Sequence, residues 1–155
     1  MSLIHGFHLS DVVITGKNGT IDGNGEFWWR RHGSGCTKGV DVDCGVETHT
    51  RGHLIELMWC SDIVLSHLSL RMSPFWTVHP VYSKGFTAHD LTIYNPSHSP
   101  NTDGIDPDST SDVDIHDCRV ITGDDCEPRD SPSVCLSVCL AVWLSVWLAG
   151  CLCLS

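Results

Sequence analysis

The sequence has few positive charges and no Cys-x-x-Cys pair. Its 155 residues include 9 Lys and Arg against 19 Asp and Glu, which gives a net charge of −10 and a pI of about 5.2. No basic patch stands out, so nucleic acid is not an expected partner. The first residues show no charged leader followed by an apolar run and a cleavage site, so no signal peptide is visible in this chain.

The cysteines outside the last part of the chain do not have metal-binding spacing. They are Cys36, Cys44, Cys60, Cys118 and Cys126. Without a Cys-x-x-Cys pair, zinc and thioredoxin-type sites are not predicted. Two interpretations stay open: a disulfide, with Cys36 and Cys44 the nearest pair, if the protein is secreted, and buried free thiols. We predict no cofactor and no metal site.

An internal repeat begins near residue 61. The segments 61–70, 84–93 and 111–120 align with offsets of 23 and 27 residues. Apolar residues fall at four matching places: Ile63, Phe86 and Val113; Leu65, Ala88 and Ile115; Leu68, Leu91 and Cys118; Leu70, Ile93 and Val120. Two short strands separated by a polar pair, repeated at this period, predict an all-β solenoid in which like residues stack inside the coils.

The chain before the repeat is less regular. Residues 9–25 alternate β-branched runs with Asn-Gly and Asp-Gly, which predicts strand, turn and strand. We interpret Phe27-Trp28-Trp29 as an aromatic plug at the end of a coil rather than as a sugar-stacking surface. Residues 30–52 are rich in glycine and charge and are predicted to form a long loop.

Two acidic clusters stand about one coil apart. They are Asn101-Thr102-Asp103-Gly104-Ile105-Asp106 and Gly123-Asp124-Asp125-Cys126. A second register agrees, because Val78-His79-Pro80 matches Ile105-Asp106-Pro107 at the offset of 27 and places Asp103 between Trp76 and Asp124. Stacked strands lie ~4.8 Å apart, so the clusters should converge. Converging carboxylates suit glycosidic hydrolysis, in which one protonates the leaving oxygen and others activate water.

Other polar residues of the repeat receive no site role. His67, His89 and His116 occupy bend positions, where solvated histidines are common, and we assign them no metal. A run of aspartates suggests calcium but lacks the glycine and closing glutamate of an EF-hand. Most are expected to be solvated coil edges; the run is Asp103, Asp106, Asp108, Asp112, Asp114 and Asp117.

The repeat pattern stops after residue 127. From Leu136 leucine recurs every fourth residue, and Leu-Ser-Val-Cys is what the repeated tetranucleotide CTGT encodes. We interpret residues 132–155 as a translated simple DNA repeat. The rival interpretation is a membrane helix over residues 134–155, which are uncharged and long enough to span a bilayer.

Together these motifs resemble the polygalacturonases, glycoside hydrolase family 28. The matching motifs are Gly19-Thr20-Ile21-Asp22-Gly23-Asn24-Gly25, Trp28-Trp29, Ser73-Pro74-Phe75-Trp76-Thr77-Val78-His79-Pro80, and the two acidic clusters. The two clusters in tandem are the specific part. The resemblance divides the chain into a β-helix fragment, residues 1–127, and a low-complexity apolar tail, residues 128–155.

The resemblance implies a right-handed parallel β-helix that hydrolyses α-1,4-galacturonosyl bonds of pectin with inversion, as a secreted monomer. By position, Asp124 corresponds to the general acid, and Asp103 with Asp125 to the pair that positions and deprotonates water. Packed carboxylates cannot all ionise cheaply, so one should keep its proton. Asn101 and His79 are expected to contact the polygalacturonate.

Two motifs of the family do not follow Cys126, namely Gly-His-Gly and Arg-Ile-Lys. The resemblance therefore implies a truncated and inactive chain. Two alternatives stay open: a β-helix module that binds acidic glycans without cleaving them, and a form tethered to a membrane by the tail. A calcium-dependent pectate lyase would share the fold, but the pairing of Asn-Thr-Asp with Gly-Asp-Asp favours hydrolysis.

Overall fold

The computed structural model describes residues 2–30 and 50–124 of the chain. Its elements are β1 (Ile4–Phe7), β2 (Ser10–Asp22), α1 (Gly25–Trp29), β3 (Ile55–Met58), β4 (Ser61–Arg71), β5 (Val78–Val81), β6 (Lys84–His89), β7 (Thr92–Tyr94), β8 (Ser111–His116) and β9 (Arg119–Ile121). No helix among these residues is long and apolar enough to cross a membrane, and the tail lies outside them.

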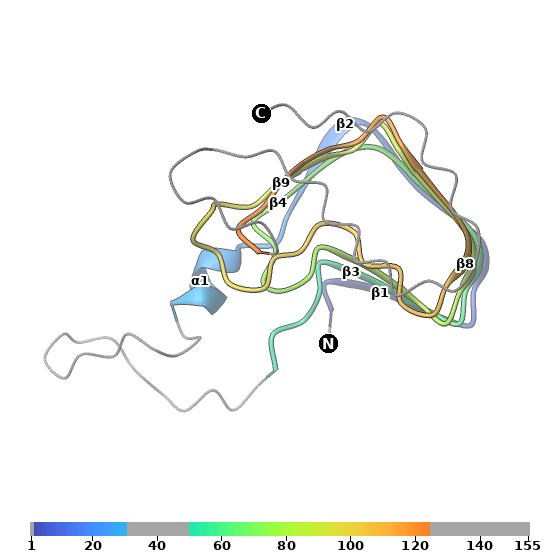
Figure 1. Cartoon of the computed structure of the whole chain (residues 1–155), viewed down its shortest axis with the longest axis horizontal. Helices are drawn as coiled ribbons and strands as arrows, with labels where there is room; N and C mark the ends of the chain where they lie inside the picture. Colours follow the sequence, from blue (N-terminus) through green and yellow to red (C-terminus); the bar gives the residue numbers. More distant parts are fainter. Residues whose placement is uncertain (1, 31–49, 125–155) are drawn as a thin grey trace, which may run out of the picture.

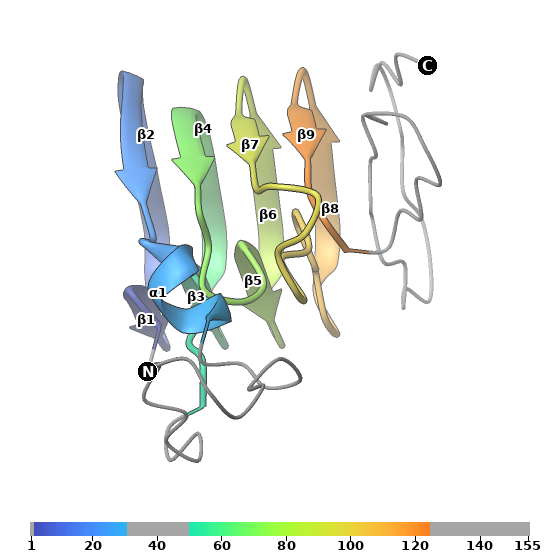
Figure 2. The ribbon, with the colours of Figure 1, turned by 90° about the vertical axis from the view of Figure 1, so that its left-hand side faces the viewer.

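The strands wind into a parallel β-helix. One sheet is ordered β1-β3-β5; the other is ordered β8-β6-β4-β7-β9, with β2 beside β4, and every pairing is parallel. Figure 1 shows the coils end-on, with β1 and β3 on one side of the cross-section, β8 on another and β9 on a third. Figure 2 shows β2, β4, β7 and β9 side by side in that order. The predicted fold is confirmed.

The predicted register is also confirmed. Phe86 pairs with Ile63 on one side and with Val113 on the other, which gives the offsets of 23 and 27. Ile93 likewise lies between Leu70 and Val120. These ladders form the core, where nearly all of their members are buried. Because side chains alternate across a strand, the polar residues between them point outward.

The corners of the coil are marked by residues with positive φ. Three ladders repeat with the coil: His8, Trp59, Tyr82 and Ser109; Asp11, Asp62, Gly85 and Asp112; Asn18, His67, Asp90 and Asp117. The left-handed conformation turns the chain sharply between two strands, and Asn, Asp and His tolerate it better than most residues. The polar pairs of the repeat are therefore its bends.

The prediction for residues 9–25 is wrong in one respect. A single strand, β2, runs through the expected Asn18-Gly19 turn. Between Thr15 and Gly19, β2 has two more residues than the matching part of β4, so the pairing register shifts there. Asn18 has φ 58 and lies at the corner. The Asn-Gly pair marks a bulge in a bent strand, because the neighbouring strand holds both halves in line.

The aromatic segment forms the short helix α1. Trp29 is buried, and its indole N–H donates to the carbonyl of Ser73 at 3.0 Å. Phe27 is 47% exposed. The packing role is therefore confirmed for Trp29 and wrong for Phe27. The predicted loop lies almost entirely outside the described residues, as do Cys36, Cys44 and Cys126. Cys60 is a buried thiol whose Sγ donates to the carbonyl of Met58 at 3.3 Å.

Candidate active site

Asn95 anchors the first acidic cluster from inside the coil. It is fully buried, and its Oδ1 accepts the backbone N–H of Ser73 at 2.8 Å. Its Nδ2 donates to Thr77 Oγ1 at 3.0 Å and to the carbonyl of Thr102 at 3.1 Å. A buried amide with several partners fixes the groups around it. Asn95 therefore holds the backbone between Asn101 and Asp103.

Thr102 joins the two acidic clusters. Its hydroxyl lies 3.1 Å from that of Thr122, which also donates to the carbonyl of Thr102. Gly123 follows, and a Cβ built there would lie 2.5 Å from the carbonyl oxygen of Pro96. Only glycine allows this approach. The segment that carries Asp124 is thereby drawn against the segment that carries Asp103.

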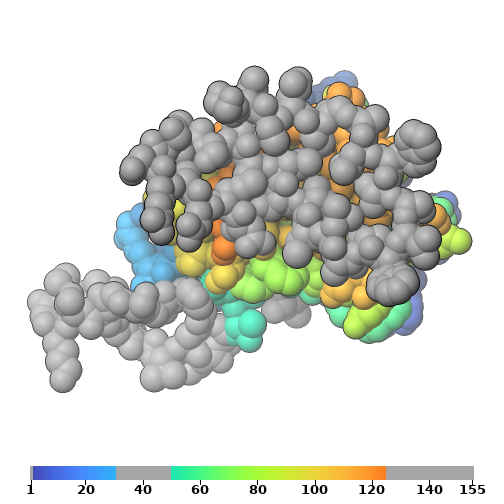
Figure 3. Space-filling model, in the orientation of Figure 1, coloured from blue at the N-terminus to red at the C-terminus, as the bar shows by residue number. Residues whose placement is uncertain are grey.

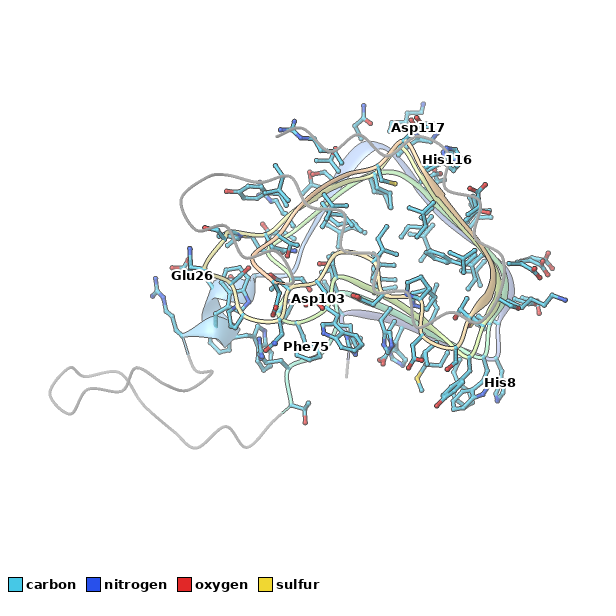
Figure 4. The ribbon with its side chains drawn as sticks, viewed as in Figure 1. His8, Glu26, Phe75, Asp103, His116 and Asp117 are labelled. Carbon is cyan, nitrogen blue, oxygen red and sulfur yellow. The ribbon has the colours of Figure 1, made fainter. Side chains whose placement is uncertain are left out.

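Asp103 and Asp106 lie where the second register placed them. Val78 bridges to Ile105, and the N–H of Thr77 donates to the carbonyl of Asp103 at 2.8 Å, so Asp103 follows Trp76 by one coil. Asp103 is 8% exposed and Asp106 is 5% exposed. Figure 4 shows Asp103 and Phe75 on the same side of the coil. These two aspartates are not solvated edges, whereas Asp108, Asp112, Asp114 and Asp117 are exposed as expected.

Asp124 is linked to the first cluster through Asn101. The Nδ2 of Asn101 donates to Asp124 Oδ2 at 3.1 Å, and its Oδ1 accepts from an Nη of Arg51 at 2.7 Å. Both ends of the Asn101 amide are thus engaged within the protein. The clusters meet as predicted at Asn101 and Asp124, while contact of Asn101 with substrate stays a prediction. Asp125 lies outside the described residues.

Arg51 holds the side chain of Asn101 in place, and this role of Arg51 was not predicted from the sequence. The other Nη donates to the carbonyls of Pro100 at 2.7 Å and Pro74 at 3.1 Å, and Cζ lies 4.9 Å from the centre of the Phe75 ring. Arg51 is 6% exposed, and its guanidinium ties three coil segments together. In Figure 3, side chains near residues 50, 75 and 100 adjoin on one side of the molecule. Arg51 precedes the first repeat, so periodicity gave no signal for it.

His79 belongs to a second cluster on the outward face of β3 and β5. It pairs with Glu56 across the sheet, and its Nδ1 lies 3.7 Å from Glu56 Oε1. His53, just before β3, places its Nε2 3.5 Å from the same oxygen. The two imidazole centroids are 4.6 Å apart, and Trp76 meets His79 edge to face at 4.9 Å. Sequence reasoning named His79 but missed His53 and Glu56.

Burial decides the charge of both imidazoles. It lowers the pKa of His53 to about 4, with His79 adding to the shift and Glu56 opposing it. Burial also lowers the pKa of His79, against Glu56 and Asp108. Both rings are therefore neutral near pH 7. His79 is 8% exposed, and its contact with substrate stays a prediction.

The bend histidines form a different cluster. His89 stacks on His116 at 5.2 Å with their rings 4° from parallel, and His67 meets His89 edge to face at 5.2 Å. The Nδ1 of His116 lies 2.9 Å from Asp117 Oδ2, and this contact raises the pKa of His116. Figure 4 shows this pair at the corner between β8 and β9, away from Asp103. The bend position predicted for these histidines is confirmed; His67 is exposed there, whereas His89 and His116 are half-buried.

Comparison with known families gives one consistent match. The model of the Glycosyl hydrolases family 28 matches residues 1–131. A probable polygalacturonase of Vitis vinifera is 50% identical over 125 residues, which are 81% of this chain and 23% of that protein. An exopolygalacturonase of Zea mays is 30% identical over 118 residues, 76% of this chain and 27% of that protein. The chain thus spans about a quarter of the length of these relatives.

Solved structures agree. The exopolygalacturonase of Thermotoga maritima matches with a TM-score of 0.68 and 26% identity, over 79% of this chain and 33% of that chain. The polygalacturonase of Erwinia carotovora ssp. carotovora matches with a TM-score of 0.65 and 30% identity, over 79% of this chain and 32% of that chain. The described coils therefore resemble about a third of such an enzyme.

Proposed function

This chain belongs to the glycosyl hydrolases family 28, and from that premise we propose that the protein hydrolyses α-1,4-galacturonosyl bonds of pectin-type polygalacturonate outside the cell. The observation that carries the proposal is the meeting of the two acidic clusters, where Asn101 bonds to Asp124 at 3.1 Å. Asp103 and Asp124 come from different coils, and only the fold brings them to one face. Relatives that share this stretch are named polygalacturonases.

In the proposed reaction Asp124 is the general acid. Its Oδ2 accepts the N–H of Asn101, so the transferable proton sits on Oδ1. That proton passes to the glycosidic oxygen as its bond to the anomeric carbon breaks. The hydrogen bond to Oδ2 fixes the carboxyl rotamer, because Asn101 is itself held by Arg51 at 2.7 Å. The acid thus acts from a defined position.

Asp103 and Asp125 activate the water. One of them takes a proton from the water as it attacks the anomeric carbon on the face opposite the leaving group, which inverts the centre. The position of Asp103 supports this role, since it is buried and lies two residues from Asn101, which bonds to Asp124. Asp125 is included in this role because it stands next to Asp124 in the sequence.

The test is release of reducing ends from polygalacturonate by the full-length protein, with binding measured separately by calorimetry. We expect the unmutated full-length protein to hydrolyse polygalacturonate, and we expect Asp124→Asn to lose hydrolysis while it keeps binding. Binding without hydrolysis in the natural sequence would instead support a glycan-binding module. Formation of an unsaturated product that a calcium chelator stops would replace hydrolysis by lyase chemistry.

A further inference from the structure

None of His53, Glu56 and His79 is the acid, the base or a water-activating group of the proposed reaction. It offers three ligand atoms, His53 Nε2, Glu56 Oε1 and His79 Nδ1, that all lie within 4.8 Å of one another. Two imidazoles and one carboxylate are the donors of many three-ligand zinc sites, which keep a fourth position open. Nitrogen donors also argue against calcium and magnesium, which prefer oxygen alone.

The spacing of these atoms is close to that of a tetrahedral site. Bonds of about 2.0–2.1 Å to a tetrahedral ion place its ligand atoms about 3.3–3.4 Å apart. The two spacings to Glu56 Oε1 are 3.5 Å from His53 and 3.7 Å from His79. The two histidine nitrogens lie within 4.8 Å of each other, so rotation of the side chains is what would bring all three atoms to tetrahedral spacing.

The imidazole of His79 points to a ligand that the protein alone does not supply. The His79 side chain is nine-tenths buried, and neither Nδ1 nor Nε2 has a hydrogen-bond partner among the described residues. Buried polar atoms are rarely left so. Its Nδ1 faces Glu56 Oε1, the oxygen that His53 also faces. An ion between the three atoms would satisfy all of them.

The surroundings hold the ligands in place. The second carboxylate oxygen, Glu56 Oε2, accepts the hydroxyl of Ser2 at 2.7 Å, which turns Oε1 toward the histidines. Phe75 stacks on Trp76 at 5.4 Å, and these rings contact His53 and His79. Such outer contacts orient metal ligands and strengthen binding.

We propose that His53, Glu56 and His79 bind one divalent transition-metal ion, such as Zn²⁺, on the outward face of β3 and β5. The histidines bind as neutral imidazoles and Glu56 as a carboxylate. Water or another ligand completes the fourth position. The site lies one coil before Asp106, so a bound ion would add positive charge to an acidic face of the molecule.

The experiment is calorimetric titration of the full chain with Zn²⁺ after chelator treatment and dialysis, together with visible spectra of the Co²⁺ form. Glu56→Gln is the main variant, because it keeps the shape and the bond from Ser2. His53→Ala is the second variant. The matched control is His89→Ala, since His67, His89 and Asp90 also place ligand atoms within 4.8 Å but at the exposed bend.

We expect one Zn²⁺ per chain and a four-coordinate Co²⁺ spectrum. Glu56→Gln and His53→Ala should each weaken binding by more than about 100-fold, because losing an outer-shell partner alone costs about 10- to 100-fold. His89→Ala should bind as the natural chain does. Equal binding by Glu56→Gln, loss of binding in His89→Ala, or a thiolate charge-transfer band from cysteine ligation would each overturn the proposal.

Discussion

The sheet cluster of His53, Glu56 and His79 on β3 and β5 and the bend ladder of His67, His89 and His116 both bring histidines of neighbouring coils together. The pKa values of their imidazoles nevertheless shift in opposite directions. Burial lowers the pKa of His53 to about 4, whereas contact with Asp117 raises that of His116. Neighbouring carboxylates are present in both places. The comparison shows that, on this fold, the side chains covering a histidine cluster determine the direction in which its pKa values shift.

The covering follows from position in the coil. The sheet cluster lies on a sheet face that Phe75 and Trp76 cover, and this face continues to Asp106 and Asp103. The bend ladder lies at a corner with positive φ, where the chain turns away and solvent reaches the rings. A histidine is therefore desolvated on the first face and hydrated on the second. The residues of the proposed site, Asp103 and His79, lie on the more buried face.

The largest expected effect separates the two faces by activity. Asp124→Asn in the full-length protein should lower turnover by about 100- to 10,000-fold, because Asn cannot deliver the proton to the leaving oxygen. The matched control is Asp117→Asn at the bend, which should leave turnover unchanged. Reducing-end release measures both. Near-normal turnover of Asp124→Asn would remove the assignment of the acid, and an equal loss in both variants would erase the distinction between the faces.

The next effect concerns stability. Asn95→Ala should lower the free energy of unfolding by about 2–4 kcal/mol, because the N–H of Ser73 and the carbonyl of Thr102 lose their buried partner. His89→Ala at the half-buried bend should lower it by less, about 1 kcal/mol, the typical cost of a single substitution. Urea unfolding followed by tryptophan fluorescence gives both values. Equal losses would show that the bend is as tightly held as the site.

A smaller effect tests the support of Asn101. Arg51→Met should lower kcat by up to about 100-fold with KM little changed, because the amide that orients Asp124 loses its guanidinium partner. Arg51→Lys should recover part of the loss, since one charged donor returns. Initial rates over a range of polygalacturonate concentrations separate the two constants. A rise in KM alone would place Arg51 in substrate binding instead.

The smallest effect is a pH dependence of opposite sign on the two faces. The pKa of folded His53, about 4, lies below the unfolded value of about 6.5. Its contribution to stability is therefore complete above pH 6.5 and is lost as the pH falls toward 4. The raised pKa of His116 contributes stability below pH 6.5 and loses it as the pH rises through that pKa. Burial is the main cause of the low pKa of His53; His79 and the amino terminus lower it further, and Glu56 opposes the shift.

Titration by NMR in the presence of a chelator checks this contrast. The imidazole signal of His53 should stay neutral down to about pH 4, and that of His116 should titrate above 6.5. Asp117→Asn should lower the pKa of His116 and leave His53 unchanged. A normal pKa for His53 would mean that solvent reaches the sheet cluster.

The coils could be predicted because their ladders repeat. Ile63, Phe86 and Val113 face the same interior, so selection for a similar shape leaves a period in the sequence. The contact between Asn101 and Asp124 also follows from the spacing of about one coil between their clusters. The repeat alone therefore predicts that the acidic clusters meet.

Residues outside the repeat could not be found this way. Arg51 reaches Pro100 and Asn101 from a segment without periodic signal, and Asn95 bonds to three segments from within the coil. His53 lies beside His79 only because β3 and β5 pair. The Asn18-Gly19 turn failed because pairing with β4 outweighed the local preference of these residues.

From β4 onward, changes of length from coil to coil are confined to one junction. Leu70 to Val78 is 8 residues, whereas the equivalent step from Ile93 to Ile105 is 12, and these four residues account for the change of offset from 23 to 27. The added stretch leads into the Asn101–Asp106 segment, while the core ladders keep their spacing. For evolution and for engineering alike, this junction can accept new sequence without a cost to the scaffold.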